Sequence, residues 1–267
     1  MDNLQMLKNY IIWYATSKNL HGVHSPFMYN FMDQCLYARQ DKIVFEDIEL
    51  QRTRLIKNRQ MLTFKDPGAG TRNGTALKQN DFTSKSIRQI AKHSLQPPKY
   101  ARLLHRIAVY FQCKNILEMG TSFGITTAYL SKAVKDGNIT TIEGVDAIAD
   151  IADGVFNNTN CDNVNLHRGV FSDVLPDVAA GSFPWDMIYL DGNHNGKDVL
   201  NYFSLLVKHI NTEGVMILDD IRWSPSMWQA WNEIKNHQQV RVTADLFFMG
   251  LAFFNPALSK EHFSLRF

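Results

Sequence analysis

From residue 112 onward, short apolar runs alternate with segments that are compatible with helices. Each run holds only four or five residues, a typical strand length, and each is followed by a longer stretch of mixed polar and apolar residues. Strands that alternate with helices are joined by right-handed crossovers into a parallel sheet whose faces are covered. The pattern therefore predicts an α/β fold of the doubly wound class. The predicted strands are 115–119, 139–142, 164–167, 187–190 and 215–218.

The first 111 residues show a different pattern. Apolar residues recur there at helical spacing, and glycine and proline interrupt them. We therefore predict two domains, a mainly helical and basic extension over 1–111 and an α/β domain over 112–267. The extension would be a lid, a substrate-binding region or an oligomerisation region. Within it, the Gly-rich segment 66–74 is predicted to be a plain loop, with a backbone nest for an anion as the alternative.

Charge is distributed unevenly along the chain. The net charge is +2, yet the segment from Leu50 to Arg106 holds thirteen Lys or Arg residues against two acids, Asp66 and Asp81. A solvated basic surface, a site for an anionic ligand and a nucleic-acid surface are all compatible with such a segment. Nucleic acid is disfavoured because few aromatic residues lie among these charges to stack on bases.

Several classes of protein are excluded by the sequence. No apolar run approaches the roughly 20 residues of a membrane span, and the first residues lack the pattern of a secretion signal. The three cysteines, Cys35, Cys113 and Cys161, are far apart, so neither a disulfide framework nor a zinc site is indicated. We expect a cytoplasmic protein with reduced thiols and no membrane partner.

The first predicted strand contains Glu118 and leads through Gly120, Thr121, Ser122 and Gly124 into a helix. In a dinucleotide site the second glycine of such a turn lets the backbone approach a pyrophosphate, but serine stands at that position here. Glu118 would also place negative charge beside a diphosphate. A carboxylate at this position suits a ligand with a cationic head and no phosphate, such as S-adenosylmethionine.

The next two predicted strands offer groups for a nucleoside. Glu143, followed by Gly144, stands 23 residues after Gly120, a spacing that suits a carboxylate binding both hydroxyls of a ribose. A solvent-exposed acid at a strand end is the alternative. After the third strand, Gly169 and Phe171 are placed to flank an adenine ring.

Carboxylates end the last two predicted strands. Asp191 follows one of them, and Asp219 and Asp220 follow the other. If these strands are adjacent and parallel, their ends lie ~5 Å apart, and three carboxylates would repel one another unless a cation neutralised them. Oxygen ligands of this kind favour Mg²⁺, Mn²⁺ or Ca²⁺ over zinc. The alternative is that one aspartate caps a helix and another binds the amine of the cosubstrate.

Four segments, in this order and at this spacing, together resemble the class I S-adenosylmethionine-dependent methyltransferases, with the catechol and caffeoyl-CoA O-methyltransferases and related bacterial methyltransferases as the most similar members. They are 115–127, 141–144, 190–194 and 217–220. The resemblance covers 114–254 and implies a Rossmann-like, mostly parallel sheet that ends in an antiparallel hairpin formed by 240–246 and 247–254.

The same resemblance assigns roles to the predicted site. It implies that Glu118, Gly120 and Gly124 hold the methionine end of the cosubstrate, Glu143 the ribose and Phe171 the adenine. It also places the divalent-cation ligands at the three aspartates, although Asp220 stands where the family usually has asparagine. The predicted cosubstrate-binding residues are Glu118, Gly120, Thr121, Ser122, Gly124, Glu143, Gly144, Gly169, Phe171 and Asp191, and the predicted metal ligands are Asp191, Asp219 and Asp220.

The resulting hypothesis is methyl transfer to a hydroxyl of a small acceptor, which could be anionic, with help from a divalent cation. His194 is the candidate general base, with a loop hydrogen bond as its alternative role, and Asp191 is the second candidate catalytic residue. Trp223, Trp228 and Trp231 could form the wall of an acceptor pocket or pack in the core.

Three alternatives stay open. The chain could be a metal-independent methyltransferase of RNA or another polyanion, recruited by basic residues such as Arg52, Arg54 and Arg59. It could bind S-adenosylmethionine without catalysis, or it could be an NAD-dependent oxidoreductase.

The oligomeric state is a separate question. Five apolar residues near the N-terminus could form a homodimer surface or pack on the sheet, namely Met6, Tyr10, Trp13, Phe27 and Met28.

Overall fold

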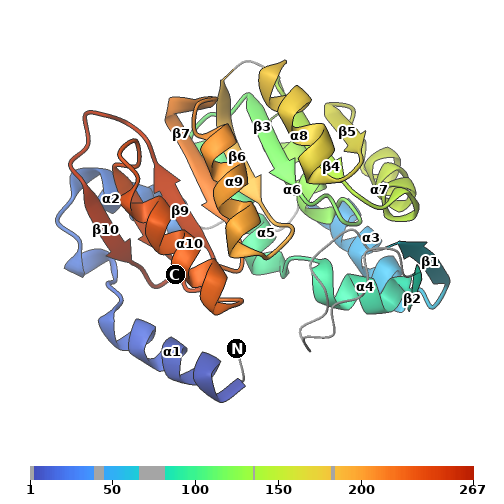
Figure 1. Ribbon diagram of the computed structural model, residues 1–267, viewed down its shortest axis with the longest axis horizontal. Coiled ribbons are helices and arrows are strands. Elements are labelled where there is room, and N and C mark those ends of the chain that lie inside the picture. Colours follow the sequence, from blue (N-terminus) through green and yellow to red (C-terminus); the bar gives the residue numbers. More distant parts are fainter. Residues whose placement is uncertain (1–2, 39–44, 66–81, 135, 182–183) are drawn as a thin grey trace. The chain divides into compact units, whose positions relative to one another are not determined.

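The computed structural model describes residues 3–38, 45–65, 82–134, 136–181 and 184–267 (Figure 1). They belong to two compact units. One unit combines Met1–Ala38 with Ser182–Phe267, and we call it the terminal unit. The other, Arg39–Gly181, is the central unit. Residues 39–111 therefore share a unit with the first part of the strand and helix alternation. No helix in the described part of the chain is long and apolar enough to cross a membrane.

The central unit contains three parallel strands in the order β3, β4, β5. These strands confirm the predictions at 115–119, 139–142 and 164–167, and a helix follows each one. The elements are β3 (Asn115–Met119), α6 (Ile125–Ala133), β4 (Asn138–Glu143), α7 (Asp146–Asn158), β5 (Val164–Arg168) and α8 (Phe171–Ala180). The pairing of Glu118 with Thr141 and of Glu143 with Arg168 brings the ends of these strands to one edge.

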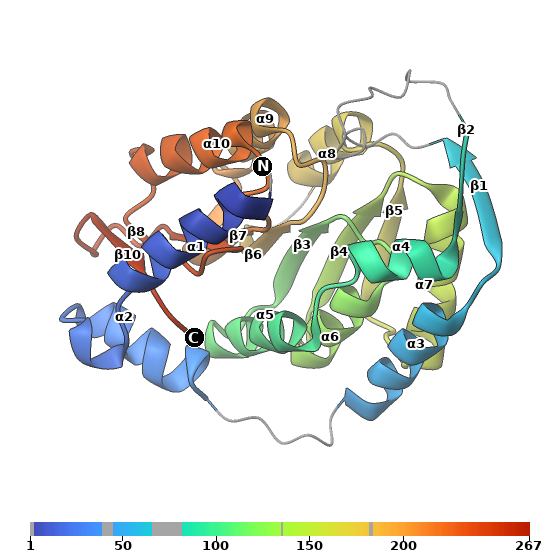
Figure 2. The same cartoon turned by 90° about the horizontal axis from the view of Figure 1, so that it is seen from below.

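The rest of the central unit is less helical than the sequence predicts. Its helices are α3 (Glu46–Lys57), α4 (Ile87–Ser94) and α5 (Pro98–Tyr110), and Figure 2 shows α5 beside α6 and α3 beside α4. Between α3 and α4 the chain forms an antiparallel pair of strands, β1 (Met61–Lys65) and β2 (Phe82–Ser86), which the prediction missed. Phe64 is buried whereas Thr63 and Lys65 are exposed, as expected for a strand with one covered face. The predicted loop 66–74 lies outside the described residues.

The terminal unit contains five strands in the order β10, β8, β9, β7, β6. The parallel pair β6 and β7 and the antiparallel pairs of β9 with β7 and with β8 confirm the predicted strands and the predicted C-terminal hairpin. The last strand, β10, was not predicted and pairs parallel with β8. The elements are β6 (Trp185–Leu190), α9 (Gly196–Leu206), β7 (Ile210–Leu218), α10 (Pro225–Asn236), β8 (Val242–Asp245), β9 (Gly250–Phe253) and β10 (Glu261–Ser264).

Two N-terminal helices also belong to the terminal unit, α1 (Asn3–Thr16) and α2 (Pro26–Phe31). Trp13 is buried, and its indole Nε1 donates to the carbonyl oxygen of Asp245 at 3.2 Å. Met28 is fully buried, and the ring of Phe27 lies 5.1 Å from that of Phe253. The sequence left open whether these residues form a homodimer surface or pack within the fold. Trp13, Phe27 and Met28 pack within the terminal unit.

The helix α6 begins at a glycine that no other residue can replace without strain. Gly124 has a φ of +76°, and a Cβ built there would lie 2.6 Å from the ring of Phe156. Phe156 belongs to the apolar core of the central unit, so its ring has little room to move. The start of α6 is therefore fixed by both backbone conformation and packing.

We predict that Gly124→Ala lowers the free energy of unfolding by about 2–4 kcal/mol, because it combines a left-handed alanine with an overpacked core. The matched control is Gly154→Ala within α7, where a Cβ meets nothing within 4 Å. That change should be neutral or stabilising by up to about 1 kcal/mol, because alanine favours helix. Urea unfolding of both variants tests this, and equal effects would contradict it.

Candidate functional site

A tight turn connects β3 to α6 at the predicted glycine motif. Gly120, Ser122 and Gly124 all have positive φ, at 107°, 47° and 76°. The amide groups of Gly120 and Thr121 donate to the carbonyl oxygen of Ile142 at 3.1 and 3.2 Å, which ties the turn to the end of β4. Serine therefore adopts the left-handed conformation at the position where a dinucleotide motif has glycine.

Glu118 is fully buried below this turn. Its Oε2 accepts hydrogen bonds from the hydroxyls of Thr127 on α6 and Thr141 on β4, the latter at 2.7 Å. The hydroxyls of Thr121 and Thr141 are themselves 2.6 Å apart. The carboxylate is thus held by donors from two structural elements, α6 and β4, and the two threonines that bind it were not identified from the sequence.

Glu143 joins the ends of all three central strands. Its Oε2 accepts from the amide of Ser122 at 2.9 Å, and its Oε1 accepts from the amide of Val145 at 3.0 Å. Its own carbonyl oxygen accepts from the amide of Gly169 at 2.9 Å. The structure therefore brings together the glycine turn, the acid 23 residues later and the glycine after β5. Gly144 follows Glu143 directly and is half-buried.

Of two further residues of the central unit, Phe171 follows the end of β5 and Ser94 contacts the turn. Phe171 is half-buried and opens α8, directly after Gly169 and Val170. The hydroxyl of Ser94, at the end of α4, lies 2.7 Å from that of Ser122. The sequence analysis did not identify Ser94, because it is 28 residues before Ser122 and belongs to none of the recognised motifs.

The predicted carboxylates of the terminal unit lie together. Leu190 of β6 pairs with Leu218 of β7, so Asp191 and Asp219 leave adjacent parallel strands. The carboxyl group of Asp219 is buried beside that of Asp191. The hydroxyl of Tyr189 also donates to Oδ2 of Asp191, at 2.9 Å, a contact that the sequence did not reveal.

This proximity changes the protonation of Asp219. Burial raises its pKa well above the usual range, and the charges of Asp191 and Asp220 raise it further. Like charges this close are relieved either by a shared proton or by a cation. The donor chemistry fits a hard divalent cation, although the described residues include no group of three His, Cys, Asp or Glu side chains arranged to hold a metal ion.

His194 lies beside the third of these aspartates. Its Nε2 is 3.9 Å from Oδ2 of Asp220, and its ring centroid is 5.3 Å from that of Trp223. Asp220 and the neighbouring Asn193 both adopt positive φ, near 50°. Asn and Asp adopt this left-handed conformation more readily than other residues with a side chain do.

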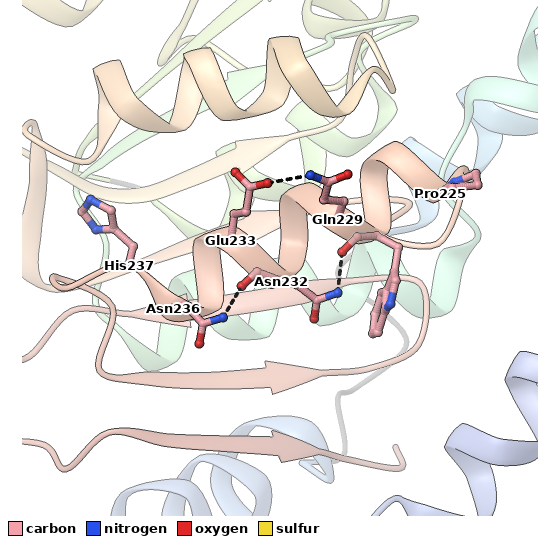
Figure 3. Close-up of a pocket in the computed structure, with 7 residues that line it drawn as sticks. Pro225, Gln229, Asn232, Glu233, Asn236 and His237 are labelled. Atoms are coloured by element: carbon pink, nitrogen blue, oxygen red, sulfur yellow. Dashed lines mark hydrogen bonds between the residues drawn. The ribbon is translucent and has the colours of Figure 1, made fainter.

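The tryptophans after β7 have three different environments. Trp223 lies next to His194, and Trp231 is fully buried, with its ring close to Gly250. Trp228 lines a cavity of about 490 Å³ that runs along α10. Figure 3 shows hydrogen bonds within α10 among the residues that line this cavity, as in the contact of Gln229 with Glu233 at 2.9 Å. Of the residues considered for the site from the sequence, only Trp228 lines it, and none of the predicted cosubstrate, metal or catalytic residues does.

The basic segment divides into paired and exposed residues. Arg52 is buried, bound to Glu49 at 3.0 Å and to the carbonyl oxygen of Gln96 at 2.6 Å, so it stabilises the central unit. Arg54 and Arg59 are exposed. Of the three arginines considered for polyanion binding, only these two are open to a partner.

The hydrogen bond from the hydroxyl of Thr141 to the buried carboxylate of Glu118 can be tested by mutation. Thr141→Val keeps the size of the side chain but removes one of the hydroxyls that donate to Glu118, so we expect a loss of about 1–3 kcal/mol in the free energy of unfolding. Thr140→Val, on the neighbouring residue of β4, is the matched control and should cost less than about 1 kcal/mol. Denaturant unfolding measures both, and equal losses would contradict the assigned role of Thr141.

Comparison with known proteins places this geometry in context. Residues 117–221 match the model of a protein family described as a methyltransferase domain. A catechol O-methyltransferase of Niastella koreensis is 29% identical over 126 residues, which cover 46% of this chain and 56% of that protein. An uncharacterized mimivirus protein is 38% identical over 52 residues, 18% of this chain and 24% of its own length. The chain thus spans about half or less of these curated relatives.

Solved structures share the fold. The O-methyltransferase TomG of Streptomyces achromogenes, in complex with SAM, has a TM-score of 0.53 at 23% identity, covering 60% of this chain and 82% of its own. An O-methyltransferase of Bacillus cereus, in complex with SAH, has a TM-score of 0.56 at 17% identity, covering 84% and 94%. The SAH-bound methyltransferase PaMTH1 of Podospora anserina reaches 0.58 at 13% identity, covering 87% and 97%. These similarities confirm the predicted Rossmann-like fold.

Proposed function

We propose, on the premise that residues 117–221 belong to the family of methyltransferase domains, that this protein transfers the methyl group of S-adenosylmethionine to a hydroxyl of a small acceptor. The observation that carries the proposal is the position of Glu143. Its carboxylate is bonded to the glycine turn after β3, at the end of the strand where a doubly wound sheet binds its ligand.

The cosubstrate would lie along the strand ends of the central unit. Glu118, Gly120, Thr121, Ser122 and Gly124 would hold its methionine end. Glu143 and Gly144 would bind the ribose, and Gly169 and Phe171 the adenine. Two relatives of known structure support this choice of ligand, because they are complexes with SAM and SAH.

The chemistry needs few groups. The bond between the methyl carbon and the sulfonium sulfur breaks with its electron pair remaining on sulfur, and a bond forms from the acceptor oxygen to that carbon. Alignment of the two bonds and exclusion of water lower the barrier. The hydroxyl proton needs an acceptor, and His194 is the candidate, since Asp220 at 3.9 Å would stabilise the imidazolium that forms.

Asp191, Asp219 and Asp220 would hold a divalent cation, Mg²⁺, Mn²⁺ or Ca²⁺. When bound, such an ion lowers the pKa of a coordinated hydroxyl and so supplies a better nucleophile. The support for it is electrostatic, because a buried aspartate stands between two other acids.

Calorimetric titration with SAM and with SAH tests the cosubstrate. Glu143→Ala should weaken binding at least ~10-fold, since it removes both the ribose acceptor and the acceptor of the Ser122 amide. Asp162→Ala removes an exposed acid of the same unit and should bind as the wild type does. Absence of binding by the wild type would remove the proposal, and unchanged binding by Glu143→Ala would remove the role of Glu143.

Thermal unfolding with and without Mg²⁺ tests the cation. We expect Mg²⁺ to raise the unfolding temperature of the wild type and to lose this effect in Asp191→Asn and Asp219→Asn, because each variant removes a negative ligand. Asp177→Asn, an exposed change outside the carboxylate group, should keep the effect. Full methyl transfer to an identified acceptor by both site variants would show that no cation is required.

A polyanionic acceptor, RNA above all, is the second candidate, and the structure offers one specific observation for it. The amide of Arg88 donates to the carbonyl oxygen of Asn58 at 2.7 Å, so the exposed Lys57 and Arg59 leave the chain beside Arg88. Salt-sensitive RNA binding that is lost in Arg59→Glu and Arg88→Glu would favour this acceptor. Tight SAM binding without transfer to any acceptor of a broad panel would indicate a binding protein.

A further inference from the structure

Arg222 stands two residues after Asp220, the last of the three candidate metal ligands, and it is buried. Its Nη1 and Nη2 donate to the two carboxylate oxygens of Asp245 at 2.7 and 2.6 Å, and Nη1 also donates to the carbonyl oxygen of Phe247 at 2.7 Å. Asp245 is buried as well. The chemistry proposed above uses neither residue of this ion pair.

The contacts of Arg222 select arginine over lysine. A planar guanidinium can bind both oxygens of one carboxylate and lie over aromatic rings at the same time, whereas an ammonium cannot. Here the guanidinium carbon lies 4.3 Å from the ring centroid of Trp228 and 4.9 Å from that of Phe247. The side chain of Arg222 is therefore held in one defined position.

Asp245 ends at the same edge of the sheet as the candidate metal ligands. Leu218 of β7 and Asp245 of β8 both pair with Gly250 of β9, so one strand separates them. At the usual spacing of strands their Cα atoms are roughly 10 Å apart. Arg222 thus connects the loop after β7 to a fourth carboxylate of this edge, on the far side of β9.

The loop that carries Asp220 is attached on both sides of this residue. Before it, the amide of Asp219 donates to the carbonyl oxygen of Leu190 at 2.9 Å. After it, the amide of Ile221 donates to a carbonyl oxygen of the turn between β8 and β9 at 3.0 Å, and Arg222 binds the same turn. Asp220 itself has a φ of 50°. The position of its carboxylate therefore depends on the turn after β8.

The charge of Arg222 gives Asp245 a second effect. A guanidinium two residues from Asp220 is a counter-ion that can neutralise nearby carboxylates in place of a metal ion. Asp245 binds both terminal nitrogens of this guanidinium, so its positive charge is balanced within the pair. Asp245 also attracts the amine of Lys235, which Arg222 repels. The repulsion among the candidate metal ligands is then left for a separate cation or a proton to relieve.

We propose that Arg222 and Asp245 are positioning residues of the carboxylate site, which fix Asp220 for cation binding and keep the guanidinium from replacing the cation. This inference rests on the proposed function, because it concerns the cation that Asp191, Asp219 and Asp220 would hold. The alternative is that the pair only stabilises the terminal unit. Apolar side chains of similar size often replace a buried ion pair without loss of stability, so the two roles can be separated.

Calorimetric titration of the full chain with MnCl₂ measures the cation affinity without an acceptor. The double variant Arg222→Met with Asp245→Leu replaces both charges with apolar side chains. We expect it to unfold in urea as the wild type does but to bind Mn²⁺ at least ~10-fold more weakly. Wild-type affinity in this folded variant would overturn the proposal and leave the proposed cation site intact. Absence of Mn²⁺ binding by the wild type would remove both.

Two single variants give a test that does not depend on the folding of the double variant. Asp245→Asn keeps the size of the side chain but leaves the guanidinium unbalanced, so the Mn²⁺ affinity should fall further than in the double variant. Arg222→Lys keeps the charge but loses the two-pronged contact with Asp245, and its Mn²⁺ affinity should fall at least ~3-fold. Unchanged affinity in both variants overturns the proposal.

Arg241→Met is the matched control. Arg241 directly precedes β8, at the opposite end of this strand from Asp245, and its Nε donates to the carbonyl oxygen of Leu258 at 2.9 Å. The change removes the same charge from the same unit and should leave the Mn²⁺ affinity unchanged. A loss as large as that of the double variant would show that the site responds to any loss of a guanidinium, which contradicts positioning by Arg222.

Discussion

The arrangement of the central unit depends on one carboxylate. Glu143 accepts hydrogen bonds from the amide of Ser122 and from that of Val145, and its carbonyl oxygen accepts from Gly169. A charged acceptor fixes backbone donors more strongly than a neutral one does, so the turn after β3 and the loops after β4 and β5 hold a defined geometry. The same bonds make Glu143 the group that a ribose would meet in competition with the Ser122 amide.

The terminal unit faces the opposite electrostatic problem. Whereas Glu143 accepts hydrogen bonds from backbone amides, the strand ends of the terminal unit bring three carboxylates together. The pKa of Asp219 is raised because it is buried beside Asp191 and Asp220. The neighbouring contacts, from Tyr189 to Asp191 and from His194 to Asp220, add a hydroxyl donor and a titratable base. Such a cluster is costly unless a proton or a cation resolves the repulsion, and this cost is a reason to expect a functional role.

Much of this could be predicted from the sequence, because the signals are local. The strands β3 to β7 are short apolar runs, and the polar residues that end them are the candidate site. The antiparallel pair β1 and β2 was missed. Both strands lie in the basic segment, and they are separated by about twenty residues, so no local turn signal connects them. Contacts over long separations were also out of reach. Arg52 looked like a free cation until the structure showed the carbonyl of Gln96, 44 residues later, bound to it.

For helix α1, the sequence pattern predicted the helix but not which of its faces is buried. Its apolar spacing predicts a helix, but the residues at that spacing, Leu4, Leu7, Ile11 and Tyr14, are exposed. The face that turns inward is set by the contact of Trp13 with Phe247, far along the chain. Periodicity shows that a helix has an apolar face, whereas only the tertiary contacts show which partner covers it.

The most direct test of the central claim is a crystal structure of the protein with S-adenosylhomocysteine. The account predicts both ribose hydroxyls within hydrogen-bond distance of the Glu143 carboxylate, the adenine beside Phe171 and the amino-acid end at the turn from Gly120 to Gly124. Density for the ligand elsewhere, for example in the cavity along α10, with the bond from Ser122 to Glu143 undisturbed, would contradict the account.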